Sequence, residues 1–286
     1  MEKSEIVNKF LQEGFLLSPK ILDKLTEEKI SQLLPEIKTK NILVLTELDE
    51  PEITFTIKKQ AKPKSVTVKD IAEYYSKKYS AIKTILSAKL DPISINNLKN
   101  GSQQTIIGLI SGSGAAFFAE DSTGKIELVC DKQMQQNSIL GLAGQVKENK
   151  FFVSGVFYPD IPLDKKIKEI DFKLIFRLEK GQPIILVNGR EIKDFPMPTT
   201  ASIKKGQTTN ILVYKPEQPL TKNQLVEALK LRCLPEPKIP SENYIIEDEP
   251  DLFWVIQKDS WVENYKGVKI ISGESAEIGA EPGKYI

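Results

Sequence analysis

Residues 105–112 read TIIGLISG, and four comparable segments follow closely: AAFFAED (residues 115–121), GKIELVCD (124–131), ILGLAGQVKE (139–148) and KFFVSGVFYPD (150–160). Apolar residues recur in these segments with a period near two, which is typical of half-buried β-strands. Turns that contain glycine separate them, and in Asp121-Ser122-Thr123-Gly124 we expect Gly124 to supply the positive φ of a tight hairpin. The pattern predicts a five-stranded Greek-key barrel over residues 101–163.

The adjacent residues Phe117 and Phe118 bear on what this barrel does. Neighbouring side chains of a strand point to opposite faces, so one ring fills the barrel and the other lies outside. Barrels of the OB type bind single-stranded nucleic acid by stacking bases on exposed aromatic rings, while lysines follow the phosphates. The outer ring therefore contacts a protein partner or another domain, stacks a base, or is an incidental exposed apolar residue. The lysines nearby are Lys125, Lys132, Lys147 and Lys150, and they alternate with Glu120, Asp121, Glu127, Asp131 and Glu148.

Helices are predicted ahead of the barrel. Apolar residues recur at helical spacing over residues 6–15 and 21–34, where Pro35 ends the second run, and they predict a helical module over residues 1–60. The segments NILVLT (residues 41–46) and ITFTI (53–57) read as short strands within this module.

A linker and an amphipathic helix are predicted over residues 61–100. Thr67 and Asp70 have the spacing of a capping box, which marks the start of the helix. Tyr74, Tyr75 and Tyr79 lie on its apolar face. These rings either pack on the neighbouring domain or stack on nucleic acid.

Composition narrows the classes of function. The 286 residues include 40 Lys and Arg against 39 Asp and Glu, so the net charge of +1 gives no overall attraction to nucleic acid. The N-terminus does not read as a signal peptide, and no apolar run is long enough to span a membrane. We expect a cytoplasmic, nucleoid-associated protein with no membrane contact. Lys supplies most of the positive charge, a tendency of thermophile proteins.

Nucleophilic and metal chemistry have few candidate residues. The chain contains 2 cysteines, Cys130 and Cys233, and no histidine. The cysteines are too far apart in sequence for a zinc site and are expected to be buried apolar residues. Without histidine, neither a Ser/His nor a Cys/His pair can be assembled. The glycines of SGSGAA (residues 111–116) read as a turn, because the lysine and the helix of a phosphate-binding loop are missing.

Four stretches resemble one protein family. They are VKDIAEYYSKKYSAIKTIL (residues 68–86), DPISINNL (91–98), EDSTGKIELV (120–129) and VFYPDIPL (156–163). In their order and in their amino-acid sequences they resemble the small subunit of the archaeal D-family DNA polymerase. That subunit is related to the B subunits of eukaryotic replicative polymerases. The resemblance implies that residues 164–286 form a calcineurin-like phosphoesterase domain, which in the archaeal members is a two-metal 3′→5′ exonuclease.

The resemblance also aligns residues of this chain with metal ligands of the family. IFRLEKG (residues 175–181) aligns with Ser-Asp-Ile-His-Val-Gly, which puts Arg177 at the aspartate and Glu179 at the histidine. The segment ILVNGRE (residues 185–191) resembles a strand ending in Ala-Gly-Asp and puts Arg190 at an aspartate. The remaining aligned positions are Lys215, at the histidine of a Tyr-His-Gly step, and Gln257 and Asp259, within the segment that carries Gly-His-x-His.

These replacements imply a phosphoesterase-like domain that does not catalyse phosphodiester cleavage. Two-metal phosphodiester cleavage needs anionic and imidazole ligands that hold the cations and activate a water. Arg177, Arg190 and Lys215 put fixed positive charge at these positions. We therefore expect no catalytic residue, no metal and no other cofactor. The new cations either pair with Glu179 and Asp259 in a salt-bridge cluster or are solvated surface residues.

The sequence thus predicts an α+β multidomain chain with a helical N-terminal module, an OB-type barrel and a shortened, degenerate phosphoesterase-like domain at residues 164–286. Trp254 and Trp261 belong to an aromatic patch that is either core or an interface hot spot. The expected function is that of a non-catalytic accessory subunit, with a polymerase catalytic subunit or another replisome protein as partner. The alternative is a stand-alone protein that binds single-stranded nucleic acid through its barrel.

Overall fold

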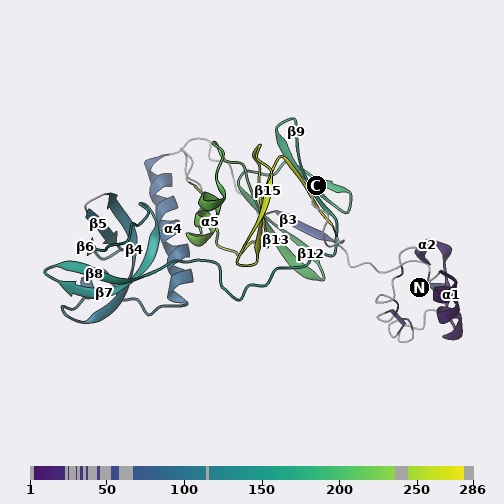
Figure 1. Cartoon of the computed structure of the whole chain (residues 1–286), viewed down its shortest axis with the longest axis horizontal. Helices are drawn as coiled ribbons and strands as arrows, with labels where there is room; N and C mark the ends of the chain where they lie inside the picture. Colours follow the sequence, from purple (N-terminus) through teal and green to yellow (C-terminus); the bar gives the residue numbers. More distant parts are fainter. Residues whose placement is uncertain are drawn as a thin grey trace. The chain divides into compact units, whose positions relative to one another are not determined.

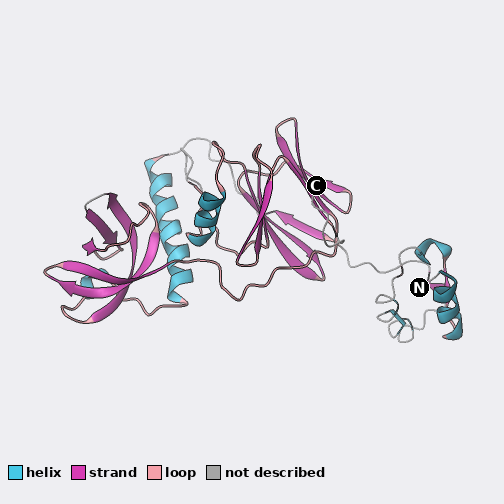
Figure 2. Cartoon of the chain, in the orientation of Figure 1, coloured by secondary structure: helices cyan, strands magenta, loops and turns pink. Residues whose placement is uncertain are grey.

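The computed structural model of the chain describes residues 3–22, 25, 30, 33–34, 37, 44–45, 53–57, 67–113, 116–235 and 244–279. The fold class is α+β, with few helices and with sheets that are mostly mixed (Figure 2). The chain divides into two compact units, Met1–Ile53 and Thr54–Ile286, which are described separately below.

The first unit is built on a small apolar core. Its elements are α1 (Lys3–Gln12), β1 (Leu16–Leu17), α2 (Pro19–Leu22) and β2 (Val44–Leu45), and β1 pairs with β2 in parallel. The helical spacing predicted over residues 6–15 is confirmed by α1, which buries Ile6 and Phe10. The rest of the predicted second helix lies largely outside the described residues. The core residues are Ile6, Phe10, Phe15, Ile21, Leu25, Ile30 and Ile37.

Strand β3 (Thr54–Ile57) belongs to the second unit. It pairs antiparallel with β12 (Thr199–Lys205), so that Ile57 lies opposite Ala201 and Thr54 opposite Lys204. The sequence prediction placed these four residues in the N-terminal module of residues 1–60. The alternation of apolar and polar residues predicts a strand here. It does not indicate the partner strand β12, which lies about 150 residues further along the chain and is selected by tertiary packing.

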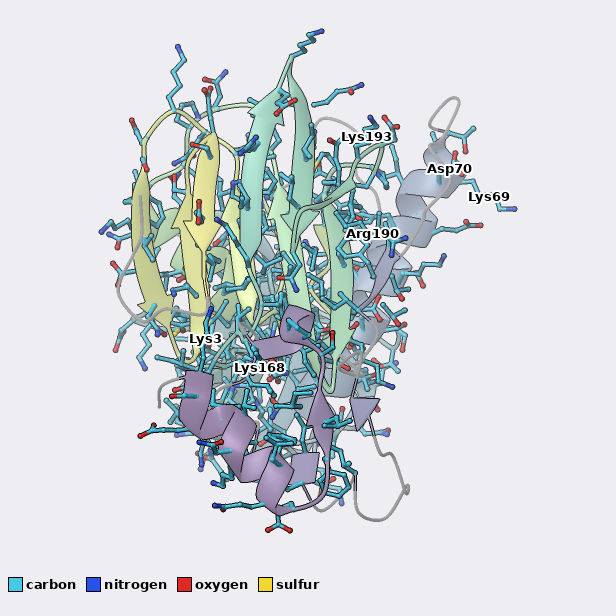
Figure 3. The ribbon with its side chains drawn as sticks, turned by 90° about the vertical axis from the view of Figure 1, so that its right-hand side faces the viewer. Lys3, Lys69, Asp70, Lys168, Arg190 and Lys193 are labelled. Carbon is cyan, nitrogen blue, oxygen red and sulfur yellow. The ribbon has the colours of Figure 1, made fainter. Side chains whose placement is uncertain are left out.

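Helix α4 (Val68–Ser87) begins with the predicted capping box. The Thr67 hydroxyl accepts a hydrogen bond from the Asp70 backbone N–H, and the Asp70 carboxylate accepts one from the Thr67 N–H. The helix buries Tyr74, Ile82 and Leu86 and packs on the barrel, while Asp70 lies at its exposed end (Figure 3). Tyr79 donates to the Ile107 carbonyl at 2.9 Å, and burial, with a smaller effect of Asp121, raises its pKa to about 12. Tyr74 is therefore buried, and Tyr79 is half-buried and held to the barrel by its hydroxyl.

Five strands close into a barrel in the order β4-β5-β6-β8-β7 (Figure 1). All neighbours are antiparallel except β6 and β8. Its interior is filled by aliphatic side chains and by Phe151. The strand bounds are β4 (Gln103–Ser113), β5 (Ala116–Glu120), β6 (Lys125–Val129), β7 (Ile139–Lys147) and β8 (Lys150–Phe157), preceded by the 3-10 turn η1 (Ile95–Asn97).

The hairpin between β5 and β6 uses its glycine differently from the prediction. Gly124 is not among the residues with positive φ. A Cβ at this position would lie 2.6 Å from Oδ1 of Asn96, so any larger residue here requires the Asn96 side chain to move. The turn is held by Asp121, whose Oδ1 accepts hydrogen bonds from the N–H groups of Thr123 and Gly124. Its Oδ2 accepts from the Ile95 N–H, and although burial opposes it, these hydrogen bonds lower the pKa of Asp121.

Two sheets follow the barrel. The six-stranded sheet has the order β15-β16-β14-β13-β12-β3 and contains the parallel neighbours β13, β14 and β16, and the four-stranded sheet has the order β11-β10-β9-β17. Between them Trp254 packs on Phe176 with the ring centroids 4.9 Å apart, and both side chains are fully buried. The remaining bounds are β9 (Leu174–Glu179), β10 (Gln182–Val187), β11 (Arg190–Ile192), β13 (Gln207–Tyr214), α5 (Lys222–Lys230), β14 (Leu252–Val255), β15 (Trp261–Tyr265), β16 (Val268–Ser272) and β17 (Ser275–Ile278).

None of the helices in the described ranges combines the length and the apolar composition needed to cross a membrane.

Candidate functional site

The carboxyl ends of the parallel strands β13, β14 and β16 lie at one edge of the six-stranded sheet, called here the carboxyl edge. Lys215 follows β13, and Gln257 and Asp259 follow β14. The end of β9 lies beside them, because Lys215 Nζ donates to the Gly181 carbonyl at 3.4 Å. Sheets that contain parallel strands commonly bind ligands at such an edge. The structure therefore brings together four of the predicted ligand positions: Glu179, Lys215, Gln257 and Asp259.

Gln257 has a structural role at this edge. Its side chain is 7 % exposed, its Oε1 accepts a hydrogen bond from the Leu220 N–H at 3.0 Å, and its Nε2 donates to the Leu220 carbonyl at 3.0 Å. Both ends of the amide are thus bonded to one backbone residue, which fixes the segment ahead of α5. A side chain held in this way is not free to turn toward a ligand.

The segments after β14 and β16 are bound to each other. Ser272 Oγ donates to the Asp259 carbonyl at 2.5 Å, and Trp254 Nε1 donates to the Gly273 carbonyl at 3.0 Å. The Leu178 N–H donates to the Glu274 carbonyl at 2.8 Å, which joins β9 to the same segment. Hydrogen bonds to backbone groups therefore hold the segments at the carboxyl edge together.

The predicted salt-bridge cluster is reduced to one exposed pair. Arg177 lies 3.8 Å from Glu179, with side-chain exposures of 50 % and 55 %. Both side chains are on the outer face of β9, because Leu174 and Phe176 point inward. Within the described ranges, no ion pair links Asp259 to Arg177 or Lys215. This arrangement matches the alternative of solvated surface residues.

Arg190 does not belong to the carboxyl edge. It begins β11 and lies opposite Val187, which in turn pairs with Leu174, the first residue of β9. Glu179 is at the other end of β9, about 17 Å away at the usual rise per residue. Figure 3 labels Arg190 and the nearby Lys193 at this edge strand. The structure therefore does not bring Arg190 together with the other predicted positions.

Across the described residues, no group of three or more Cys, Asp or Glu side chains is arranged so that it could hold a metal ion.

Replacing Arg177 with Ala tests the assignment of the Arg177–Glu179 pair as a surface contact. An exposed ion pair contributes at most about 1 kcal/mol, so we expect the Arg177→Ala variant to keep its free energy of unfolding within about 1 kcal/mol of the wild type. Thermal unfolding followed by circular dichroism measures this. A much larger loss of stability would show instead that Arg177 carries a structural network.

The outer face of the barrel carries two aromatic rings between lysines. Phe117 points into the barrel and Phe118 outward, and the two rings lie on opposite faces as their alternation predicts. Lys125 Nζ lies 4.9 Å from the centroid of the Phe118 ring. On β8, Phe152 is 38 % exposed, and Lys147 Nζ lies 6.0 Å from its ring centroid.

Strand β6 connects these two rings across the outer face. Glu127 lies opposite both Phe118 and Lys150 and forms an ion pair with Lys150 at 2.7 Å. Val129 lies opposite Phe152 and is 37 % exposed. The contact residues predicted from the sequence did not include Phe152, although the doublet Phe151-Phe152 has the same alternation as Phe117-Phe118. Lys132 follows β6 in a loop and makes no ring contact with any residue that the structure describes.

The two tryptophans have different environments. Trp254 is fully buried, so it presents no surface to a partner, and the core interpretation is correct for it. Trp261 is half-buried beside the apolar core between α5 and the six-stranded sheet, and Lys222 Nζ lies 5.3 Å from its ring centroid. Only Trp261 can contribute to an interface.

Neither a protein-family model nor a curated protein matches the chain. Function is therefore argued from the residues and contacts alone.

A cavity of about 350 Å³ lies between α4, the loop before β7 and α5. Its lining includes Lys78, which is 4 % exposed and donates to the Asn137 carbonyl at 3.0 Å. Leu231, next to α5, packs in the barrel core, and Ile245 packs against α4. The segments that follow α5 thus pack on the barrel and on α4.

Proposed function

We propose that the chain is a non-catalytic accessory subunit of a DNA replication or repair polymerase assembly. The proposal assigns the barrel to the OB type and the two sheets to a degenerate phosphoesterase-like domain. The proposed partner is the one that the family resemblance implies, a polymerase catalytic subunit or another replisome protein.

The state of Gln257 is the observation that carries the proposal. A two-metal hydrolase needs its ligands free to face the cations at the carboxyl edge. Gln257 is instead bonded at both ends of its amide to Leu220, and Lys215 is directed at the Gly181 carbonyl. The edge serves as a packed support, which favours a role in binding over a role in hydrolysis.

The topology of the barrel supports the OB assignment. Its first three strands are consecutive neighbours, and the fifth strand lies between the third and the fourth. The closing contact of the third and fifth strands is the one parallel pair within this set of strands. Greek-key barrels of five strands have this kind of connection.

Co-purification tests the proposed partner. The tagged chain, isolated from its source organism at moderate salt, is expected to carry a DNA polymerase catalytic subunit in stoichiometric amount, as measured by mass spectrometry and gel filtration. The purified chain should not shorten a labelled primer strand in the presence of Mn²⁺. Absence of any polymerase or replisome protein from the isolated complex contradicts the proposal, and so does metal-dependent digestion.

The outer face of the barrel favours a second function, the binding of single-stranded nucleic acid. Phe118 and Phe152 offer ring faces, and Lys125 and Lys147 lie over them. Fluorescence anisotropy with a labelled oligothymidylate tests it. Binding in the micromolar range that weakens steeply with salt and is lost in a Phe118→Ala, Phe152→Ala variant supports this alternative. A chain that carries a polymerase but binds no oligonucleotide supports the accessory subunit.

A further inference from the structure

Glu127 on β6 and Lys150 on β8 form an ion pair on the outer face of the barrel. Their side chains point outward, because Leu128 and Phe151, the next residue of each strand, belong to the barrel core. Glu127 lies opposite Lys150 in the register of the two strands, and Lys150 Nζ lies 2.7 Å from Oε1 of Glu127. The side chain of Glu127 is 35 % exposed and that of Lys150 is 44 % exposed, so a ligand can reach both.

The pair has hydrogen-bonding capacity that the barrel does not use. Among the residues that the structure describes, Oε2 of Glu127 accepts no hydrogen bond, and Nζ of Lys150 donates only to Oε1. A carboxylate can accept at both of its oxygens, and an ammonium group carries three donors. The pair therefore presents a hydrogen-bond donor and an acceptor side by side to the solvent.

An aromatic ring lies on each side of this pair. Phe118 lies opposite Glu127 on β5, and Phe152 follows Lys150 by two residues on β8, so both rings are on the same face. At the usual dimensions of a sheet, two interstrand spacings and two residues along a strand separate the Cα atoms of Phe118 and Phe152 by about 12 Å. Stacked neighbouring nucleotides are only about 3.4 Å apart. A single strand with bases on both rings therefore has at least one further base between them, beside the ion pair.

The arrangement of groups, and not the charge, distinguishes this face of the barrel. Lys150 lies beside Glu127, and Lys125 lies 3.7 Å from Glu120, so two lysines of the face already have carboxylate partners. The distinctive feature is a pair of ring faces with a donor and an acceptor between them. This combination fits a chain of flat rings with polar edges, which is the chemistry of single-stranded nucleic acid.

The donor and the acceptor of the pair match guanine best among the bases. The base-pairing edge of guanine presents the acceptor O6 next to two donors, N1–H and N2–H. Lys150 can donate to O6 while the carboxylate of Glu127 accepts from both N–H groups. Thymine, cytosine and adenine each present one donor on this edge, so the carboxylate gains at most one hydrogen bond from them.

We propose that the outer face of the barrel binds single-stranded DNA with a guanine held by Glu127 and Lys150. Lys150 donates to O6 of this guanine, and Glu127 accepts from N1–H and N2–H. The bases on either side stack on Phe118 and Phe152. The proposal rests on the second function given above, the binding of single strands by the barrel, and it names the base that this surface selects.

Fluorescence anisotropy on the full chain tests the proposal with three fluorescein-labelled thymidine oligonucleotides of equal length. The first contains thymine throughout, the second has guanine at its centre, and the third has hypoxanthine there. Hypoxanthine is a purine that lacks the N2 amino group, so it controls for stacking. We expect the guanine probe to bind about tenfold more tightly than either of the others, because only guanine gives the carboxylate a second charge-assisted hydrogen bond.

Two matched substitutions separate the contact with guanine from a change in charge. Glu127→Gln keeps the size of the side chain but removes the charged acceptor, and it is expected to abolish the preference for guanine. Glu120→Gln removes the same charge from the neighbouring pair with Lys125, and it should keep the preference. Phe118→Ala should weaken all three probes by a similar factor, because it removes a stacking ring and no contact to the base edge. The melting temperatures of the two Gln variants should match the wild type, since both pairs are exposed.

Three outcomes contradict the proposal. Equal binding of the guanine and hypoxanthine probes by the wild type overturns the guanine contact but leaves single-strand binding intact. Loss of the preference in Glu120→Gln as well as in Glu127→Gln shows that net charge determines it, and this also overturns the contact. If no probe binds, both the guanine contact and the single-strand function are overturned, whereas the accessory-subunit function is decided separately by co-purification.

Discussion

Replacing Trp254 with Ala is expected to lower the free energy of unfolding of the second unit by about 4 kcal/mol, which is typical of removing a fully buried tryptophan from a packed core. The indole fills the space between the two sheets and packs on Phe176, with ring centroids 4.9 Å apart. Its Nε1 donates to the Gly273 carbonyl at 3.0 Å, so the truncation also leaves a buried acceptor unpaired. Urea denaturation followed by far-ultraviolet circular dichroism measures the change.

Trp254→Phe is the matched control for this prediction. It keeps an aromatic ring against Phe176 and removes the hydrogen bond to Gly273, so a loss of only about 1–2 kcal/mol is expected. Equal losses for Trp254→Phe and Trp254→Ala would mean that the hydrogen bond, and not the packing between the sheets, determines the stability of this core.

Replacing Asp251 with Ala is expected to cost about 3 kcal/mol, because breaking a buried ion pair from one side leaves the other side without its counter-charge. The carboxylate is 7 % exposed and lies between Lys165 and Lys168, whose side chains are 14 % and 27 % exposed. It also accepts a hydrogen bond from the Asn210 N–H at 2.9 Å. One truncation therefore removes the acceptor for three donors and detaches residues 165–168, between the barrel and β9, from the start of β13.

The pair of Lys173 and Glu277 provides the comparison for Asp251. Its atoms are as close, at 2.7 Å, but the side chains are 53 % and 48 % exposed. Because solvent screens an exposed pair, Glu277→Ala is expected to cost less than about 1 kcal/mol. If Asp251→Ala were as mild as Glu277→Ala in urea denaturation, the buried carboxylate would not be the anchor of residues 165–168.

The elements that follow from local pattern could be predicted from the sequence. The alternation of Phe117 and Phe118 requires that one ring enters the barrel and the other faces outward, and Thr67 with Asp70 marks the start of α4. These features depend on neighbours within a few residues, so the sequence carries the whole signal.

Features that depend on distant parts of the chain could not be predicted in this way. The pairing of β3 with β12 and the close approach of Asn96 to Gly124 both arise from tertiary packing. The burial of Trp254 could not be predicted, because a group of aromatic residues in the sequence is equally typical of a core and of an interface.

The candidate site was predicted as a set of positions but not as a set of contacts. Lys215, Gln257 and Asp259 follow parallel strands, so they meet at the carboxyl edge as expected. Arg190 follows an antiparallel hairpin, which carries it to the other end of β9. No spacing in the sequence indicates that Gln257 bonds to Leu220, because that contact depends on the path of the loop ahead of α5.

The contacts of Asp160 have a mechanical consequence for the second unit. Its carbonyl accepts from Lys89, which follows α4, and its carboxylate receives Tyr265 and Lys266 from the turn between β15 and β16. Asp160 therefore links three parts of this unit that are far apart in the sequence: the chain that leaves the barrel, the end of α4 and the turn between β15 and β16. These contacts restrict rotation of the barrel relative to the six-stranded sheet.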